Sequence, residues 1–212
     1  MESITPQIIF YIFGIPISST IISTWVVMAV IISLVLFISK SFPVALDMIG
    51  ELLTGIISSV MTIKNTNNYL PLLGSLAIFI AVSNSIGIVP ILTAPTSDIN
   101  TPIALSLVVF FSVHFYGIQK KGLINYFKEF ASPIFLLPFE IIGQVSRTLS
   151  LSLRLFGNII SGELITAIVF GLIPLIAPLP LIGLSLFIGI LQAYVFTALS
   201  SLYIDLAIAT NK

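Results

Sequence analysis

The sequence of 212 residues contains no cysteine and a single histidine, His114. The lack of cysteine excludes disulfides, thiolate metal sites and cysteine nucleophiles, and one histidine cannot build a multi-histidine metal site. Charged side chains make up only 8% of the residues, against about 25% in an average soluble domain. The eight basic and eight acidic side chains cancel, so net charge indicates no nucleic-acid partner. We expect no cofactor and no bound metal.

Apolar residues are abundant instead, at 58% of the chain, which indicates an integral membrane protein. Runs of 18 or more apolar residues mark spanning helices, because about 20 residues cross the hydrocarbon core. The first apolar run is not preceded by the basic residues of a cleaved signal peptide, so we expect a retained anchor. The sequence predicts five spanning helices, at residues 19–38, 70–91, 102–118, 134–172 and 181–209.

The fourth predicted helix is too long to cross the membrane upright. At nearly 40 residues it would reach roughly 55 Å, against a hydrocarbon core of about 30 Å, so it must tilt strongly or bend. Pro174, Pro178 and Pro180 follow it, and we expect them to end the helix and reverse the chain into a hairpin. Residues 42–68 mix acidic, serine and apolar side chains, which predicts an amphipathic helix along the cytoplasmic interface. The expected fold is all-α.

The positions of the lysines predict the orientation in the membrane. One side of the five-span arrangement carries every lysine in its loops and ends, and the other side carries no Lys or Arg. By the positive-inside rule, the N-terminus faces outward and the C-terminus faces the cytoplasm. We expect one domain over residues 1–212, with an anchor and interfacial part (1–69), the second and third spans (70–133) and the tilted hairpin (134–212). The lysines are Lys40, Lys64, Lys120, Lys121, Lys128 and Lys212.

A polar stripe runs along the fourth predicted helix. Positions seven apart differ by only about 20° around a helix, so Arg147 and Arg154 share a face. Glu140 and Asn158 lie on the same side. An arginine at the centre of a lipid-embedded helix costs roughly 3 kcal/mol on insertion scales, so it needs a compensating partner. Glu140, Gln144 and Arg147 are spaced four and three residues apart, which predicts a local charge-compensating set.

Arg154 has no such partner in the sequence. Glu163, the nearest acid, is nine positions away and points to the opposite face, and Asp205 lies near the end of the fifth helix. That helix offers Ser185 and Gln192 on one face, but neutral groups cannot neutralise a guanidinium, which stays protonated in proteins. We infer that the anion opposite Arg154 belongs to another subunit.

The sequence resembles one known family, subunit a of the rotary F-type ATP synthase. The likeness is strongest in the run SLSLRLFGNIISGEL, preceded by PFEIIGQVSRTL and followed by LQAYVFTALSSLYI. The stretches PTSDINTPIALSL and HFYGIQKKG resemble the third-span region of the same family. The resemblance covers about residues 70–208, and the earlier part matches only in character.

The resemblance implies the non-catalytic stator half of an ion turbine. Two tilted helices would lie against a ring of c subunits, each with an essential carboxylate, and two offset half-channels would carry H⁺ or Na⁺ to that interface. Arg154 matches the essential arginine of the family, which attracts the ionised rotor carboxylate and blocks leakage between the half-channels. Gln192 matches the glutamine beside that arginine. Other matching polar positions of the ion path are Asn158, Glu163 and Glu140.

The sequence also departs from the family pattern. Ser185 stands where some relatives have a histidine, and Gln144 stands where many have an acid. Both positions still belong to the expected ion path, and we expect protons as the ion. The resemblance further implies the b-subunit peripheral stalk and membrane lipids as partners, in a bacterial plasma membrane. Arg147 either lines the ion path or extends to the membrane interface.

Two other functions stay open at this point. A self-contained transporter or channel would use Arg154 to bind an anionic substrate, but such proteins often show internal repeats and broken helices, and neither is visible. A purely structural anchor leaves the buried charges unexplained. Outside the stripe, we expect His114 to be a packed, hydrogen-bonded residue, Asp98 a helix cap or solvated turn residue, and residues 83–87 a site of close helix packing.

Overall fold

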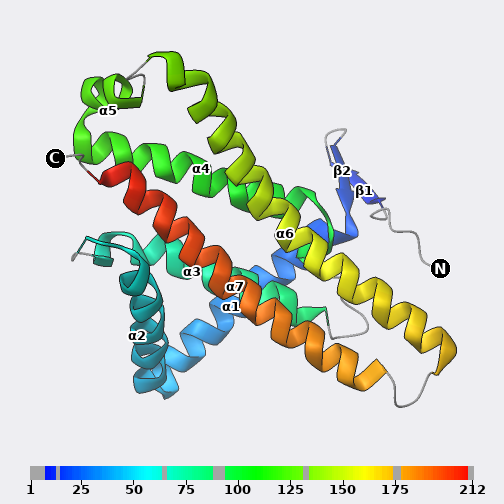
Figure 1. Cartoon of the computed structure of the whole chain (residues 1–212). Helices are drawn as coiled ribbons and strands as arrows, with labels where there is room; N and C mark the ends of the chain where they lie inside the picture. The colour runs from blue at the N-terminus through cyan, green and yellow to red at the C-terminus, as the bar shows by residue number, and fades with distance from the viewer. Residues whose placement is uncertain are drawn as a thin grey trace.

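The computed structural model describes residues 8–12, 15–63, 66–87, 94–130, 134–173 and 178–209. Most of this part of the chain is α-helical, which confirms the expected all-α membrane fold (Figure 1). Short 3₁₀ helices η1 (Thr66–Asn68), η2 (Pro95–Ser97) and η3 (Ile134–Leu136) lie in the connections. The α-helices are α1 (Ser19–Ser41), α2 (Pro43–Val60), α3 (Leu70–Ile86), α4 (Asn100–Lys121), α5 (Leu123–Phe130), α6 (Leu137–Leu172) and α7 (Pro178–Ile208).

A short β-hairpin precedes α1, and the sequence analysis did not predict it. Strand β1 (Ile8–Ile12) pairs antiparallel with β2 (Ile15–Ser18), with Ile12 opposite Ile15 and Ile8 opposite Ser18. β-branched and aromatic residues are frequent in both segments, and such residues favour strands. A short apolar segment has no clear period, so the sequence pattern gave no distinct prediction for these residues.

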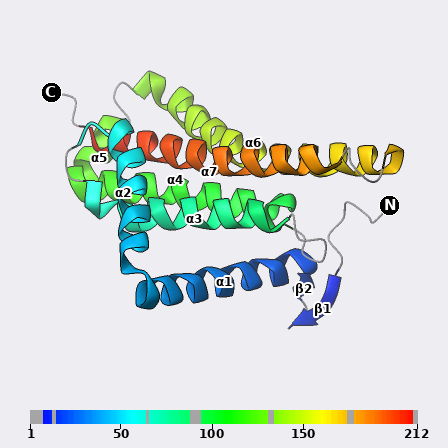
Figure 2. The same ribbon diagram turned by 90° about the horizontal axis from the view of Figure 1, so that it is seen from below.

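Length and composition identify α1, α2, α4, α6 and α7 as able to cross a membrane, whereas α3 has only 17 residues. The expected count of five is therefore met, but with α2 in place of α3. Figure 2 shows that α3 runs alongside α1, α4 and α7, and that α2 runs across them at one end of the bundle. A helix that runs across the others cannot span the bilayer together with them. The arrangement thus favours α3 as the span and α2 as the interfacial helix.

Most helix ends lie near their predicted positions. Helix α1 begins at Ser19 and α6 ends at Leu172, both as expected. Helix α7 begins earlier than expected, so Pro178 and Pro180 form its first turn and do not precede it. Proline is tolerated there because the N–H groups of the first turn have no intrahelical acceptor. Pro174, Lys64, Lys212 and residues 88–91 lie outside the described residues.

The core lies where α7 packs against α3, α4 and α6. Leu73 and Ile80 of α3, Leu155 of α6, and Phe196 and Ile204 of α7 are completely buried. These residues belong to one continuous apolar cluster, which packs α7 against α3 and α6.

Helix α5 folds back onto α4 through one tight contact. Gly122 adopts a positive φ of 79° between the two helices, a conformation that suits glycine. Tyr126 of α5 is buried against Gly117 of α4, where any Cβ would overlap the tyrosine ring. The sequence analysis had no helix at this position.

The described lysines gather at one end of the bundle. Lys40 lies in the last turn of α1, Lys120 and Lys121 in the last turn of α4, and Lys128 in α5. Figure 2 places these helix ends with α2 and α5, while the β-hairpin and the start of α7 lie at the opposite end. The predicted orientation in the membrane depends on this gathering of the lysines at one end of the bundle.

Candidate functional site on the α6–α7 hairpin

Helices α6 and α7 form an antiparallel hairpin that carries the predicted site. They run side by side in Figure 1, and they contain 36 and 31 residues. A helix of 36 residues is about 54 Å long, well beyond a hydrocarbon core of about 30 Å. The predicted length of the fourth helix is thus confirmed, and this length requires tilt or projection from the membrane.

A hydrogen bond joins the two helices near the middle of α6. Nδ2 of Asn158 donates to Oε1 of Gln192 at 2.8 Å. Gln192 is only 4% exposed, and within the described part of the chain its Nε2 has no hydrogen-bond acceptor. The structure therefore brings together two of the predicted site residues, and leaves one buried donor unused.

Arg154 lies one turn before Asn158 and is exposed on the surface of this chain. The large apolar side chains of Leu149 and Leu153 are also exposed, at 50% and 54%. Among the described residues, no carboxylate forms an ion pair with Arg154, and its guanidinium makes no hydrogen bond. A cation in an apolar, membrane-embedded surface needs an anion, and the described chain does not supply it.

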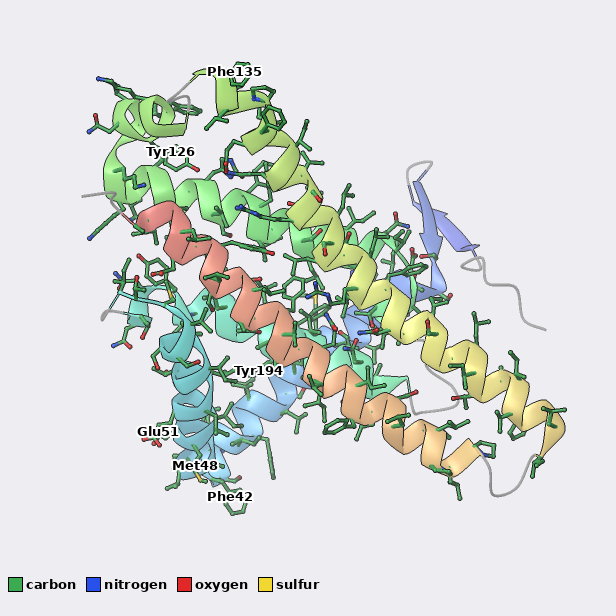
Figure 3. The ribbon with its side chains drawn as sticks, in the orientation of Figure 1. Phe42, Met48, Glu51, Tyr126, Phe135 and Tyr194 are labelled. Atoms are coloured by element: carbon green, nitrogen blue, oxygen red, sulfur yellow. The ribbon has the colours of Figure 1, made fainter. Side chains whose placement is uncertain are left out.

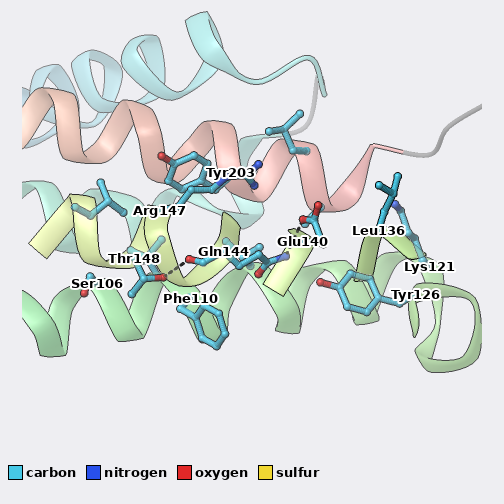
Figure 4. A pocket seen from close by; sticks show the side chains of 15 residues that line it. Ser106, Phe110, Lys121, Tyr126, Leu136, Glu140, Gln144, Arg147, Thr148 and Tyr203 are labelled. Carbon is cyan, nitrogen blue, oxygen red and sulfur yellow. Dashed lines mark hydrogen bonds between the residues drawn. The ribbon is translucent and has the colours of Figure 1, made fainter. Parts of the chain in front are cut away.

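An open pocket of about 340 Å³ lies between α4, α6 and α7, toward the lysine-rich end (Figure 4). Glu140, Gln144 and Arg147 line it together with Tyr203 of α7. Nε2 of Gln144 donates to Oε1 of Glu140 at 3.4 Å, and the Thr148 hydroxyl donates to the Gln144 carbonyl at 3.0 Å. The predicted polar set therefore exists, and it faces a space that water can enter.

Arg147 departs from the expected arrangement. Its guanidinium carbon lies 5.5 Å from the centre of the Tyr203 ring, which is a cation–π contact across the two helices. Among the described residues it forms no ion pair with Glu140. The expected set is present through the Glu140–Gln144 hydrogen bond, while the guanidinium of Arg147 contacts the aromatic face of Tyr203 on α7.

Ser185 packs directly on the backbone of α6. A Cβ added at Gly162 would lie 2.7 Å from Oγ of Ser185. Glu163 follows Gly162 and is exposed. A carboxylate and a hydroxyl therefore lie near the other end of the hairpin, on the far side of Arg154 from the Glu140 pocket.

Asp205 is not a partner of Arg154. It is 4% exposed, and its Oδ2 accepts a hydrogen bond from the Thr62 hydroxyl at 2.8 Å, while Oδ1 has no donor among the described residues. Burial raises the pKa of Tyr69 above its ordinary value, and nearby Tyr116 and Asp205 add to the effect. These groups pack the last turns of α7 against the segment between α2 and α3.

Two of the expectations for residues outside the polar stripe are confirmed. Nδ1 of His114 lies 2.9 Å from the Phe110 carbonyl oxygen, and the two rings pack with centroids 4.5 Å apart. Oδ1 of Asp98 accepts the backbone N–H of Asn100 at 3.1 Å at the start of α4. Oδ2 of Asp98 also accepts the Thr20 hydroxyl of α1 at 2.9 Å, a contact that sequence reasoning missed.

Close packing at residues 83–87 is confirmed as well, but its partners were not predicted. Asn84 donates to the Gly189 carbonyl of α7 and accepts from the Thr96 hydroxyl of η2. A threonine in a loop and a glycine in an apolar helix give no sequence signal of such a contact. The tyrosine partner of Arg147 had a weak signal, because Tyr203 shares a face with Gln192.

Comparison with known proteins places this chain in a family. A family model described as ATP synthase A chain matches residues 18–205. ATP synthase subunit a 2 of Bradyrhizobium sp. (strain BTAi1) is 40% identical over 98% of this chain and 96% of its own length. ATP synthase subunit a 2 of Picosynechococcus sp. is 38% identical over 99% and 94%, and ATP synthase subunit a of Desulfosudis oleivorans is 41% identical over 86% and 85%. This chain belongs to the subunit a family of the F-type ATP synthase.

Proposed function

We propose that this chain is the stator ion channel of its ATP synthase, with Arg154 as the fixed cation opposite the rotor carboxylate. Family membership makes the chain a multi-pass bacterial membrane protein of the Fo sector. The observation that carries the finer proposal is Arg154, which is exposed on an apolar surface of α6, one turn from the Asn158–Gln192 bond, and which has no ion pair among the described residues. Replacement of Arg154 in the assembled enzyme tests it, with the results expected in the Discussion.

The charge of Arg154 acts on each rotor carboxylate that passes. Two opposite charges 4 Å apart attract by about 4 kcal/mol at an effective dielectric constant of 20. This attraction favours the ionised carboxylate and therefore release of its ion. Because the guanidinium keeps its proton, it cannot itself pass a proton between the two sides. The chain contributes a pathway and a charge, and ATP chemistry takes place elsewhere in the complex.

Polar groups on either side of Arg154 fit the two offset half-channels. Glu140 and Glu163 lie 23 positions apart on α6, or about 35 Å along the helix, and Arg154 lies between them. The pocket of Glu140, Gln144 and Arg147 supplies the route at the lysine-rich end. Glu163 and Ser185 supply the route at the other end.

Two exposed surfaces suit the partners of such a subunit. The apolar face of α6 that carries Leu149 and Leu153 is the one we assign to the ring of c subunits. Figure 3 shows Met48 and Glu51 along α2, where large apolar side chains such as Leu52 are also exposed. We assign this face to lipid and to the b-subunit peripheral stalk.

We expect single cysteines at Asp98 and Lys121 to react with an impermeant thiol reagent from opposite faces of the membrane. Asp98 lies two residues before α4 and Lys121 is the last residue of α4, so one spanning helix separates them. With the N-terminus outward, Asp98 is reached from outside and Lys121 from the cytoplasm. The native chain has no cysteine, so the parent protein is the blank in both vesicle orientations. Labelling of both positions from one face would refute the orientation.

We expect protons to be the transported ion. Glu140 and Glu163 can relay protons through water, whereas a sodium pathway needs several oxygen ligands at each step. ATP hydrolysis by the purified holoenzyme at fixed pH should then change little as sodium rises from trace to millimolar levels. Steep activation, with protection of the rotor carboxylate from modification by sodium, would assign sodium instead.

A further inference from the structure

A buried amide joins three segments of the chain, α3, η2 and α7. Asn84 of α3 is 6% exposed, and its Nδ2 donates to the carbonyl oxygen of Gly189 in α7 at 2.9 Å. Its Oδ1 accepts the hydroxyl of Thr96 in η2 at 2.8 Å, and Thr96 is completely buried. Both ends of one side chain therefore bind groups that have no access to water. Leaving a polar group unpaired in such a place is unfavourable, so the three partners constrain each other.

The same junction is sterically tight. A Cβ added at Gly189 would lie 2.8 Å from Cβ of Asn84, closer than carbon atoms approach. At the end of α3, a Cβ at Gly87 would lie 3.2 Å from Cβ of Ala94, so η2 is packed closely against this helix. Apolar contacts fix the distance between two helices but allow them to slide along each other. A directed hydrogen bond to one backbone carbonyl also fixes the axial position.

The junction is connected to the proposed ion site through α7. Gly189 precedes Gln192 by three residues in an unbroken helix. Gln192 accepts the hydrogen bond from Asn158, and Asn158 follows Arg154 by one turn of α6. The 3₁₀ helix η2, which holds Thr96, also contacts α6. A shift of α7 at Gly189 therefore moves Gln192 relative to Asn158 and Arg154.

We propose that Asn84, together with Thr96 and Gly189, sets the axial register of α7 and so positions the Gln192–Asn158 pair beside Arg154. Asn84 is a positioning residue that acts through Gln192. The proposal rests on the proposed function of Arg154. Without the junction, Gln192 is displaced along the helix axis. Arg154 is then no longer aligned with the rotor carboxylate that passes it. ATP hydrolysis then continues with fewer ions moved per ATP.

The test compares substitutions that differ by one group. Thr96→Val removes the hydroxyl and keeps the shape, while Thr96→Ser keeps the hydroxyl. Asn84→Asp keeps the acceptor for Thr96 and removes the donor to Gly189. Ser85→Ala is the matched control, because the Ser85 hydroxyl bonds the Ala81 carbonyl within its own helix at 2.7 Å. Each holoenzyme is assayed in vesicles for subunit content, ions moved per ATP, and the ion concentration for half-maximal transport.

We expect Thr96→Val and Asn84→Asp to lower the number of ions moved per ATP about tenfold in assembled enzyme. An effect of this size is what a displacement of Gln192 by roughly 1 Å or less would cause. Thr96→Ser and Ser85→Ala should match the parent. Normal transport per ATP in assembled Thr96→Val enzyme would overturn the inference, and so would failure of this variant to assemble, since either result indicates a purely structural contact. Arg154→Ala in parallel separates the two proposals: normal coupling in that variant refutes the proposed function itself.

Discussion

We expect replacement of Arg154 with alanine to abolish ion-driven ATP synthesis in an enzyme that still assembles. The side chain is exposed on α6, and no hydrogen bond or ion pair within the described residues holds it. Its removal therefore breaks no hydrogen bond or ion pair within the described chain. A neutral residue cannot favour the ionised rotor carboxylate, so the ion is not released as the rotor passes. ATP synthesis driven by an imposed ion gradient in membrane vesicles is the measurement.

Arg154→Lys should fail almost as completely. Lysine loses its proton more readily when it is desolvated, and it lacks the planar fork that binds a carboxylate through two hydrogen bonds. Arg147→Ala is the matched control, because that guanidinium already has the Tyr203 ring as its partner, and we expect only a partial loss. Normal synthesis by an assembled Arg154→Ala enzyme would remove the basis for the proposed function.

Gly189→Ala should sharply reduce the stability of the subunit in its complex. The new Cβ would lie 2.8 Å from Cβ of Asn84, so α3 and α7 must separate and the buried hydrogen bond between them must lengthen. Overpacking of this kind costs about 1–3 kcal/mol. The thermal midpoint of the detergent-solubilised complex and the amount of subunit in membranes both report the loss.

Gly183→Ala is the control for that substitution. Gly183 lies in the same helix, and a Cβ there would meet no atom within 4 Å. Alanine is favoured over glycine in a helix by up to about 1 kcal/mol, so this variant should match or exceed the parent in thermal midpoint. Equal behaviour of the two variants would show that the packing at Gly189 is not limiting.

The sequence predicted features that depend on one helix alone. The period of 3.6 residues placed Asn158, Arg154 and Arg147 on one side of α6, and the scarcity of acids implied that Arg154 lacks a partner in this chain. The length of α6 and the hairpin followed from the apolar run and its prolines. These conclusions needed only distances along the chain.

Contacts between residues of different segments could not be predicted from the sequence. The helix period places Tyr203 on the face of Gln192 but does not show that it contacts Arg147. Nothing in the sequence shows that Thr96 reaches Asn84 from a loop. For α2 and α3, helix length and hydropathy alone select α2 as the span. The pattern of residues predicted the opposite, with residues 70–91 as a span and residues 42–68 at the interface, and the arrangement in Figure 2 favours that prediction. The strands before α1 were missed because a short apolar run fits several structures.

The two contacts between α6 and α7 impose a rule on the length of the hairpin. Eleven positions separate Arg147 from Asn158 on α6, and the same number separates their partners, Gln192 and Tyr203, on α7. Eleven residues make about three complete turns, so both contacts point in the same direction from each helix. One inserted or deleted residue between them would rotate one contact by about 100° away from its partner. In this segment a change of side chain removes one interaction, whereas a change of length by one residue separates the two contacts.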